Sequence, residues 1–455
     1  MPHIRPFRAL RYEPEVVGDL ALVTSPPYDV IGPDEQRDLL ARHPKNVVRL
    51  DLPGDELGDQ PDDKYRRAAR VFAAWRSDGT FHKDPRPAIY VYEQTYRLPG
   101  ADAELTQRGY FARVRLEPFG AGGVLPHERT LAAPREDRYK LLRATGANMS
   151  PVELMYEDPS RRASALLGAM VDDPRRGPVA DVTDRDGVRH RLWVVPAMPA
   201  AVDEANGTPE EAAPADPVTE LIGLAAAGPL TVADGHHRYE TALRYRDERR
   251  MSRSCEEDPA FDYVLALLLE STGQALTVLP THRLVGGLGD GSGDLLESVG
   301  SLFDVKRVAG REELEAAFGP AAAANGHGGH GRFGLWTRSG GAILDARRAA
   351  FSADLPSGGA ALRGLDVTLL QVALERVLGI DAAAIAAGRL SYTRSAHEAL
   401  ERVDAADGID AAFLLDPTPV PAISAVARDG DVMPQKSTYF YPKPLSGLLI
   451  NPLEW

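Results

Sequence analysis

Hydrophobic side chains in the first quarter of the chain follow two different periods. They recur at helical spacing over 63–76 and alternate with polar residues over 46–52, so we expect a helix in the first segment and a short strand in the second. The runs 88–92 and 109–116 are rich in aromatic and β-branched residues, which predicts two strands that pair as neighbours in one sheet. Asp34, which follows a Gly-Pro turn, is expected to cap a further helix.

Turn signals and apolar runs indicate further elements along the chain. An Asp-Gly pair at 186–187 separates the strand candidates 180–183 and 188–195, and we expect a hairpin there because glycine adopts positive φ without steric cost. The spacing over 367–378 predicts a helix, and the apolar run 411–416 predicts a buried strand. The expected fold class is therefore α/β with a mixed sheet.

The length of the chain, 455 residues, exceeds what one hydrophobic core usually organises. We expect an N-terminal α/β unit over 1–86, a core over 87–290 and a C-terminal α/β domain over 291–455 whose tail returns to the functional site. Within the core, about 156–217 is interpreted as an insertion that holds the hairpin and an acidic linker.

Charge and composition narrow the classes of partner. The net charge of −14 and the pI near 5.3 oppose binding to nucleic acid or to an anionic membrane, since both are polyanions. The N-terminus lacks the apolar core of a signal peptide, and no apolar run approaches the roughly 18 residues of a membrane helix, so we expect a cytoplasmic protein. The lone Cys255 excludes an intrachain disulfide and a cysteine metal cluster. His327 and His330 lie in a glycine-rich segment that is more typical of a surface turn than of a metal site.

The strongest chemical pattern is a strand at 230–233 that runs through an Asp-Gly turn into a helix. Such a turn leaves unpaired backbone N–H groups at the positive end of a helix dipole, where an anion is stabilised. Arg238 lies in the first helical turn and adds a guanidinium that can bind a phosphate bidentately. The predicted phosphate site comprises Asp234, Gly235, His236, His237 and Arg238. The alternative is that the aspartate only caps the helix while the histidines pack or face solvent.

A second group of titratable residues follows Pro126, which places His127 and Glu128 in a turn. A carboxylate in that position can remove a proton from a substrate hydroxyl, and neighbouring cations can balance negative charge on the other reactant. The alternative reading of this group is a solvated loop and helix face.

The C-terminal stretch 433–447 forms a third group, in which three aromatic residues interleave with Lys436, Ser437, Thr438 and Lys443. It either stacks on a base and contacts phosphates or docks as a tail that completes a core. No Walker-type loop, protein-kinase signature or Gly-x-Ser-x-Gly elbow occurs in the sequence. Composition and spacing alone therefore indicate an anion-binding α/β enzyme.

Six short motifs carry a resemblance to a known family. Together they resemble the widespread prokaryotic family known as domain of unknown function 1015, and they lie at 3–8, 26–31, 125–130, 233–239, 279–283 and 435–440. The order of the Pro-His-Glu turn, a helix, a strand at 150–155 and the Asp-Gly-His-His-Arg turn further resembles the ParB/sulfiredoxin fold, which includes free L-serine kinases. In this chain a hairpin and the acidic linker separate the last two elements more widely than that compact fold requires.

The resemblance implies roles for individual residues. Glu128, with His127 beside it, takes the place of the catalytic base that removes the serine hydroxyl proton, and 234–238 take the place of the turn that cradles nucleotide phosphates. ATP or ADP is the implied donor, with Mg²⁺ bridging its phosphates. Weaker candidates for contacts to substrate or phosphate are Arg129, Thr130, His282, Arg283, Lys436 and Ser437.

The leading hypothesis is a nucleotide-dependent phosphotransferase that acts on the hydroxyl of a small metabolite such as free L-serine. Its partners are then a nucleotide and a small molecule, without nucleic acid or membrane, and the sequence leaves the oligomeric state open. A ParB-like nucleotide-binding switch is the alternative from another class. A sulfiredoxin-like reductase would need a reactive cysteine, and Cys255 has no suitable setting.

Overall fold

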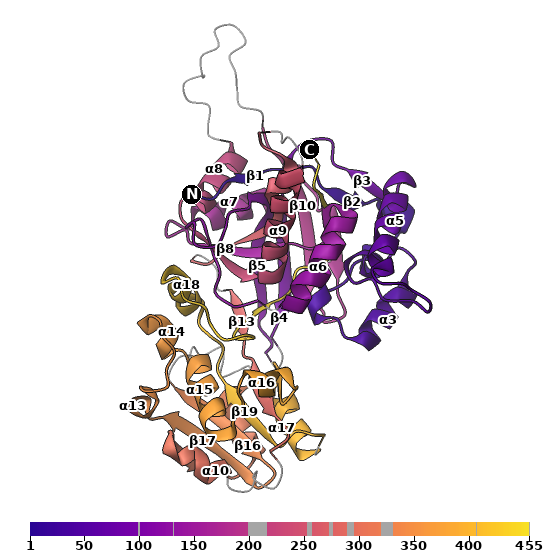
Figure 1. Ribbon diagram of the computed structural model, residues 1–455. Coiled ribbons are helices and arrows are strands. Elements are labelled where there is room, and N and C mark those ends of the chain that lie inside the picture. Colours follow the sequence, from indigo (N-terminus) through magenta and orange to yellow (C-terminus); the bar gives the residue numbers. More distant parts are fainter. Residues whose placement is uncertain are drawn as a thin grey trace.

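The protein has two lobes, each built on its own sheet (Figure 1). This computed structural model describes residues 1–98, 101–130, 132–198, 216–252, 257–272, 276–288, 295–319, 331–405 and 407–454. Cys255, His327, His330 and most of the acidic linker lie outside the described residues. The fold is mixed α/β with a large mixed sheet and smaller antiparallel sheets, which confirms the expected class at that level.

The first lobe holds a nine-stranded mixed sheet, in which β1 (Ile4–Arg5) pairs with β5. The order of its other strands is β6 (Val124–Leu125), β11 (Leu230–Asp234), β8 (Val152–Tyr156), β12 (Tyr263–Glu270), β5 (Glu104–Arg115), β4 (Ala88–Arg97), β10 (Arg189–Pro196) and β9 (Ala180–Thr183). β4 and β5 are antiparallel neighbours, and β9 and β10 form a hairpin, as predicted. β8 runs parallel to β12 but antiparallel to β11, and β6 runs parallel to β11, so the sheet is mixed at this end.

Both faces of the large sheet are buried. Side chains alternate along β4, so that Ile89 and Val91 belong to one core and Tyr90 and Tyr92 to the other. The first core is covered by α6 (Ala132–Thr145), α7 (Arg162–Val171), α8 (Pro217–Ala226) and α9 (His236–Ser252). The second core continues into the other lobe without a break. This shared core joins the two lobes. Fully burying each of its large apolar side chains stabilises the fold by on the order of 1.5–3 kcal/mol.

The N-terminal segment packs beside this sheet as a group of helices and one small sheet. The sheet pairs β2 (Leu10–Tyr12) with β3 (Phe81–Lys83). The helical elements are α1 (Pro14–Val17), α2 (Leu20–Val23), η1 (Tyr28–Val30), α3 (Pro33–Arg42), α4 (Val48–Asp51) and α5 (Asp63–Ser77). The helix predicted from the spacing over 63–76 is confirmed by α5, whose buried residues include Phe72 and Trp75.

The second lobe is built on a six-stranded antiparallel sheet. Its strands run in the order β15 (Phe303–Arg307), β17 (Gly340–Ala346), β16 (Arg332–Thr337), β19 (Ala411–Leu415), β14 (His282–Val285) and β18 (Leu390–Thr393). Its helical elements are α10 (Leu295–Ser298), η4 (Val299–Ser301), α11 (Arg311–Phe318), α13 (Arg348–Phe351), α14 (Ala360–Gly364), α15 (Asp366–Leu378), α16 (Ala382–Ala386), α17 (Ala396–Asp404) and α18 (Val420–Arg428). α15 and β19 confirm the helix and the buried strand predicted for this part of the chain.

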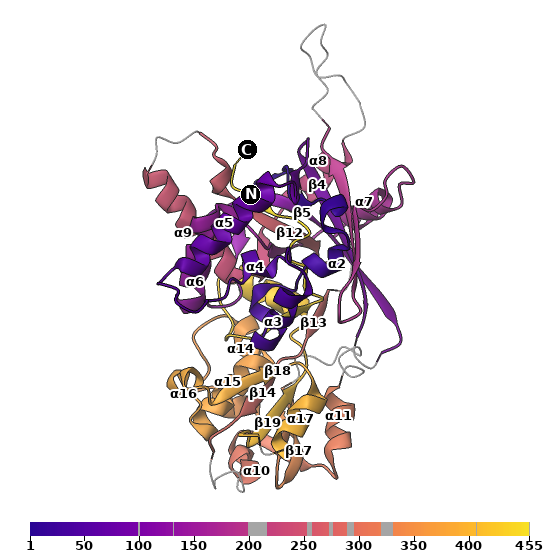
Figure 2. The ribbon, with the colours of Figure 1, turned by 90° about the vertical axis from the view of Figure 1, so that its right-hand side faces the viewer.

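The C-terminal segment returns from the second lobe to the first, and β13 lies between the lobes in both views (Figure 1 and Figure 2). β20 (Tyr439–Tyr441) pairs with β13 (Thr277–Leu279), and β21 (Asn451–Pro452) pairs with β7 (Ala147–Asn148). Between them Ile450 bridges Leu10, and Phe440, Leu445 and Leu448 are buried in the shared core. The segment thus docks and completes a core, which was one of its two predicted fates.

Two local predictions are wrong. The alternating stretch 46–52 contains α4 instead of a strand, because Asn46 accepts a hydrogen bond from the Val48 amide (3.0 Å) and donates to the Leu22 carbonyl (2.8 Å). These local contacts and tertiary burial override the alternation. Asp34 lies inside the first turn of α3, whose cap is Gly32. None of the helices that the structure describes is both long and apolar enough to cross a bilayer.

Candidate active site

The candidate residues lie where the first lobe meets the second. α9 begins where β11 ends, and the turn after β6 carries His127 and Glu128. The C-terminal segment passes beside that turn, since the Met433 amide donates to the His127 carbonyl (2.8 Å). β20 of the same segment pairs with β13, which leads into β14 of the second lobe. Stretches that are far apart in the sequence therefore meet here.

A glycine shapes the turn between β11 and α9. Gly235 has a φ of 89°, in the left-handed region, and a Cβ at this position would lie only 3.0 Å from Nε of Arg238. The Tyr239 amide donates to the Gly235 carbonyl (2.9 Å), whereas the amides before it precede the helical ladder. The turn therefore presents the positive end of the α9 dipole.

Arg238 points back onto the protein rather than out of the turn. Its Nη2 lies 2.7 Å from Oδ2 of Asp234, its Nη1 donates to the Pro151 carbonyl, and the side chain is only 8% exposed. Burial opposes the charge of Asp234, but Lys443 at 3.3 Å and Arg238 hold the pKa of Asp234 well below its usual range. The guanidinium that the sequence assigns to phosphate thus already has a carboxylate partner.

Two buried histidines join the Pro-His-Glu turn to α9. The His127 amide donates to Nε2 of His236 (3.2 Å), Nδ1 of His127 contacts the Val232 carbonyl, and Nε2 of His127 lies 3.0 Å from Oγ1 of Thr438. Burial lowers the pKa of His127 to about 4 and lowers the pKa of His236 well below its ordinary value. Both rings are therefore neutral at pH 7, and they hold Glu128 beside α9. His237, the next residue, is half-buried.

Glu128 is a half-buried carboxylate fixed by the C-terminal segment. Its Oε1 accepts a hydrogen bond from the Lys436 amide (3.0 Å). Burial raises the pKa of Glu128 to about 7, although that hydrogen bond and the charges of Lys436 and Arg283 oppose the rise. Lys436 has a φ of 55°, a strained conformation for a non-glycine residue and one that recurs at functional sites. Glu128 therefore changes protonation near neutral pH, as a general base should.

Glu153 and Asp29 at this site were not among the residues expected from the sequence, and Lys443 was expected only as part of the C-terminal stretch. Glu153 on β8 is 1% exposed, neither of its oxygens has a hydrogen-bond partner, and Lys443 lies 3.7 Å away. Burial raises the pKa of Glu153. Asp29, exposed in η1, acts electrostatically on His237, Arg238 and Lys443. A charged residue in the otherwise apolar strand 152–156 is a signal that was available in the sequence.

The remaining predicted contacts divide into two groups. Thr130 donates to Glu240 of α9 (2.6 Å), Ser437 donates to the Pro434 carbonyl (2.5 Å), and Arg129 is exposed. His282 and Arg283 lie on β14 of the second lobe, and the positive charge of Arg283 acts to lower the pKa of Glu128. The charges of Lys436 and Arg283 thus act on the Glu128 carboxylate. The hydroxyls of Thr130 and Ser437 instead donate to other groups of the protein.

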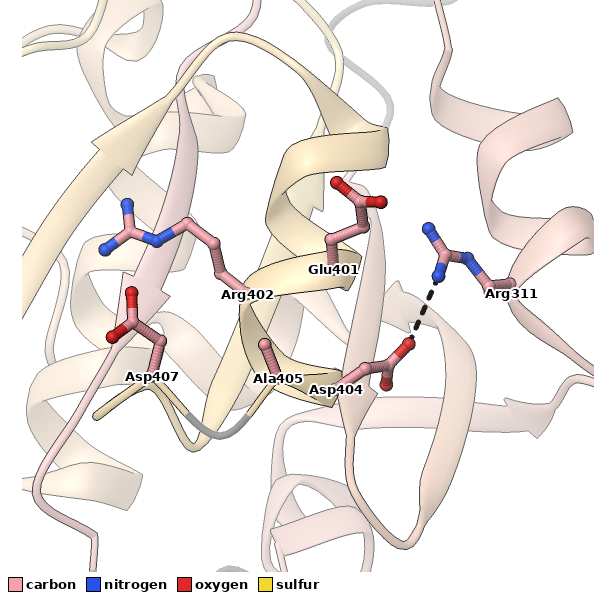
Figure 3. A pocket seen from close by; sticks show the side chains of 6 residues that line it. All are labelled: Arg311, Glu401, Arg402, Asp404, Ala405 and Asp407. Carbon is pink, nitrogen blue, oxygen red and sulfur yellow. Dashed lines mark hydrogen bonds and ion pairs between the residues drawn. The ribbon is translucent and has the colours of Figure 1, made fainter.

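One hollow in the surface of the protein lies away from these residues. It has a volume of about 620 Å³ and opens on the second lobe between α11 and α17, where Arg311 and Asp404 form an ion pair of 3.3 Å (Figure 3). Its lining residues are Arg311, Glu401, Arg402, Asp404, Ala405 and Asp407. None of the candidate residues lines this hollow.

The α9 turn fits a nucleotide phosphate through its backbone rather than through Arg238. The first-turn amides, the helix dipole and the exposed Lys436 supply positive charge. For Mg²⁺ the residues fit only an ion held mainly by phosphate oxygens, with one or two carboxylates in support. Among the described residues, neither Glu153 oxygen has a hydrogen-bond partner, although Lys443 lies 3.7 Å from Oε1. The same residues contain no group of three or more protein ligands that could hold a metal alone.

Solved structures show distant likenesses. Free serine kinase in complex with AMP has a TM-score of 0.33 at 13% identity and covers 70% of this chain and 83% of that chain. SbnI with a C-terminal truncation, from Staphylococcus aureus, has a TM-score of 0.36 at 10% identity, covering 75% and 87%. A conserved hypothetical protein from Pyrococcus furiosus has 0.32 at 12% identity, covering 71% and 88%. At scores this low the likenesses carry no argument about chemistry.

The family comparison is more extensive. No curated protein matches the chain. A family model described as "Protein of unknown function (DUF1015)" matches residues 4–368, which include the Pro-His-Glu turn, Glu153, the α9 turn and Arg283. The chain therefore belongs to the DUF1015 family.

Proposed function

We propose that this protein is a nucleotide-dependent phosphotransferase that phosphorylates the hydroxyl of a small metabolite such as free L-serine. In this proposal the first lobe contains a ParB/sulfiredoxin-like core, in which β6, β8, β11 and α9 carry the site. The N-terminal unit, this core and the C-terminal domain then have separate tasks, and the C-terminal segment returns to complete the site.

One observation carries the proposal: Glu128 is a fixed, half-buried carboxylate, and its pKa of about 7 places its proton exchange at working pH. A base is most effective when its pKa lies near the operating pH, because it is then both largely deprotonated and basic enough to take the proton. The neutral His127 holds this carboxylate beside the α9 turn without adding a competing charge.

The donor phosphates would lie on the first-turn amides of α9, with Lys436 at the exposed side. Gly235 adopts the left-handed conformation that the turn into α9 requires. Asp234 and Arg238 neutralise each other and fix the turn. A bound Mg²⁺ would neutralise charge on the phosphate oxygens, and Glu153 is the residue placed to support it.

The chemical step is then the transfer of one phosphoryl group from the nucleotide to the acceptor hydroxyl. The acceptor oxygen forms a bond to the terminal phosphorus of the nucleotide as the bond from that phosphorus to the bridging oxygen breaks. The hydroxyl proton passes to Glu128, and the electrons of the broken bond leave on the shorter nucleotide. The residues of this chain orient the two reactants and accept the proton.

The test is incubation with Mg-ATP or Mg-ADP and a panel of small hydroxy compounds that includes L-serine. We expect a phosphorylated product, and we expect Glu128→Gln to lower the rate by about 10²–10⁴-fold because the amide cannot accept the proton. Glu136→Gln is the matched control, since this exposed carboxylate on α6 pairs with Arg244.

Two outcomes would count against the proposal. Absence of product with every acceptor and both nucleotides would reject it, and nucleotide binding together with a change in assembly would then favour a ParB-like switch. A Glu128→Gln protein that remains as active as Glu136→Gln would reject Glu128 as the base.

A further inference from the structure

We infer that a carboxylate group of the acceptor binds to Arg283 on β14 and to Thr281 just before that strand. The substrate is then a small hydroxy acid. This inference rests on the proposed function, and it assigns to the second lobe a direct part in substrate selection. It concerns a different end of the substrate from the hydroxyl that meets Glu128.

Arg283 is a deeply buried cation on β14. It is 2% exposed, and among the described residues no carboxylate lies within ion-pair distance of its guanidinium. Its guanidinium donates a hydrogen bond to the Thr281 carbonyl, and Cζ lies 5.4 Å from the centroid of the Tyr392 ring. Burial lowers the pKa of Arg283 to about 10. An arginine remains charged at pH 7 even so, and a buried charge without a partner is costly.

Two other deeply buried arginines have more polar partners than Arg283. Arg138 is paired with Asp51 and Asp137, and Arg113 donates to the Asn451 side chain (2.6 Å) and the Pro452 carbonyl (2.7 Å). Arg283 differs from both, since it has one protein acceptor and a planar fork of donors that matches two carboxylate oxygens.

Thr281 provides a second polar group on the same side. Among the described residues its buried Oγ1 has no hydrogen-bond partner, and its carbonyl accepts from Nη1 of Arg283, so the two residues lie together. His282 between them is engaged elsewhere, since its Nδ1 accepts a hydrogen bond from the Leu415 amide (3.3 Å). The hydroxyl and the guanidinium together can therefore donate to one anion.

The relation to Glu128 indicates which anion fits. Glu128 and Arg283 act on each other electrostatically, so the group bound at Arg283 lies close enough to influence the base. A carboxylate carries one negative charge and balances Arg283. A phosphate would bring nearly two, which would raise the pKa of Glu128 further and keep it protonated at pH 7. A small hydroxy acid satisfies both groups at once.

The experiment compares L-serine with serinol, in which a hydroxymethyl group replaces the carboxylate. For the wild-type protein in the presence of Mg-ADP we expect kcat/KM, and affinity measured by calorimetry, to favour L-serine by at least about tenfold, the equivalent of one charge-assisted interaction. Arg283→Met should reduce this preference to within about threefold. Arg283→Lys, which keeps the charge in case the methionine variant fails to fold, should retain part of it. The matched control is Arg394→Met, since this exposed arginine directly follows neighbouring β18 and lies over the Tyr439 ring.

The affinity for Mg-ADP separates this inference from the proposed function. It should be the same in the wild type and in both Arg283 variants, because the phosphates bind elsewhere. Equal use of serinol and L-serine, or a loss of nucleotide affinity in Arg283→Lys, would overturn the carboxylate site while leaving phosphotransfer intact. Binding of L-serine over serinol that requires Arg283, without any turnover, would instead support the site and reject the phosphotransferase.

Discussion

Two clusters of buried charge in the first lobe are built from similar residues, yet only one of them is satisfied. In the first, Arg138 lies between Asp51 and Asp137, Ser446 donates to Asp51 (2.9 Å) and Tyr65 donates to Asp137 (2.7 Å). The aromatic ring of Tyr28 lies 4.0 Å from this guanidinium. Each charge in this cluster has a partner.

The second cluster lies at the α9 turn, and some of its polar atoms have no hydrogen-bond partner among the described residues. Arg238 pairs with Asp234, and Lys443 is shared between Asp234 and Glu153. Among the described residues, both Glu153 oxygens and Nε of Arg238 lack hydrogen-bond partners. The comparison teaches that burial of charge alone does not identify a site. A balanced cluster stabilises the fold, whereas an unbalanced one has donors and acceptors left for a ligand.

The largest effect is expected in the balanced cluster. Arg138→Met leaves the buried Asp51 carboxylate without its ion-pair partner and the partly exposed Asp137 with Lys64 at 3.3 Å, so the free energy of unfolding should fall by about 3–5 kcal/mol. Chemical denaturation monitored by circular dichroism measures this change. A loss below about 1 kcal/mol, the range of exposed pairs, would contradict the structural role of this cluster.

The unbalanced cluster should respond in the opposite direction. Burial raises the pKa of Glu153 in the folded protein, so the stability linked to its proton is fully present below its unfolded pKa of about 4.3 and is lost as the pH rises through the folded value. Glu153→Gln should therefore match the wild type at pH 4.5 and be more stable by about 1–2 kcal/mol at pH 8. Thermal unfolding at several pH values measures the difference. A variant that is less stable at pH 8 would mean that the carboxylate is structural.

The smallest effect is expected for an exposed ion pair that belongs to neither cluster. Arg376 and Asp354 are 2.8 Å apart with both side chains nearly half exposed. Arg376→Gln should change the free energy of unfolding by no more than about 1 kcal/mol, because water screens the pair. The same denaturation experiment measures this change. A loss larger than about 1 kcal/mol would show that the exposure of an ion pair does not predict its contribution to stability.

Much of the fold was accessible from the sequence. The periods over 63–76 and 367–378 and the Asp-Gly turn at 186–187 each indicate one local structure, and the protein has it. The stretch 46–52 was misjudged because its alternation is compatible with strand burial, while the contacts of Asn46 with the Leu22 carbonyl come from a distant part of the chain. Local pattern cannot supply such contacts.

The site was accessible only in part, for a similar reason. Glu128 and the α9 turn were expected to meet, and the hydrogen bond from His127 to His236 brings them together. Their assigned roles remain proposals. Lys443 lies between two prolines, and its position beside Glu153 depends on how the C-terminal segment docks, which no spacing in the sequence encodes. The engagement of Arg238 by Asp234 likewise became evident only in three dimensions.

The pH dependence of kcat/KM for the wild-type protein, at saturating Mg-nucleotide, tests the central claim most directly. Because burial raises the pKa of Glu128 to about 7 and only its deprotonated form accepts the hydroxyl proton, the rate should rise about tenfold per pH unit below pH 7 and level off above it. Glu128→Gln should abolish this dependence along with the rate. A profile that is flat between pH 5 and pH 9, or one that Glu128→Gln leaves unchanged, would contradict the account.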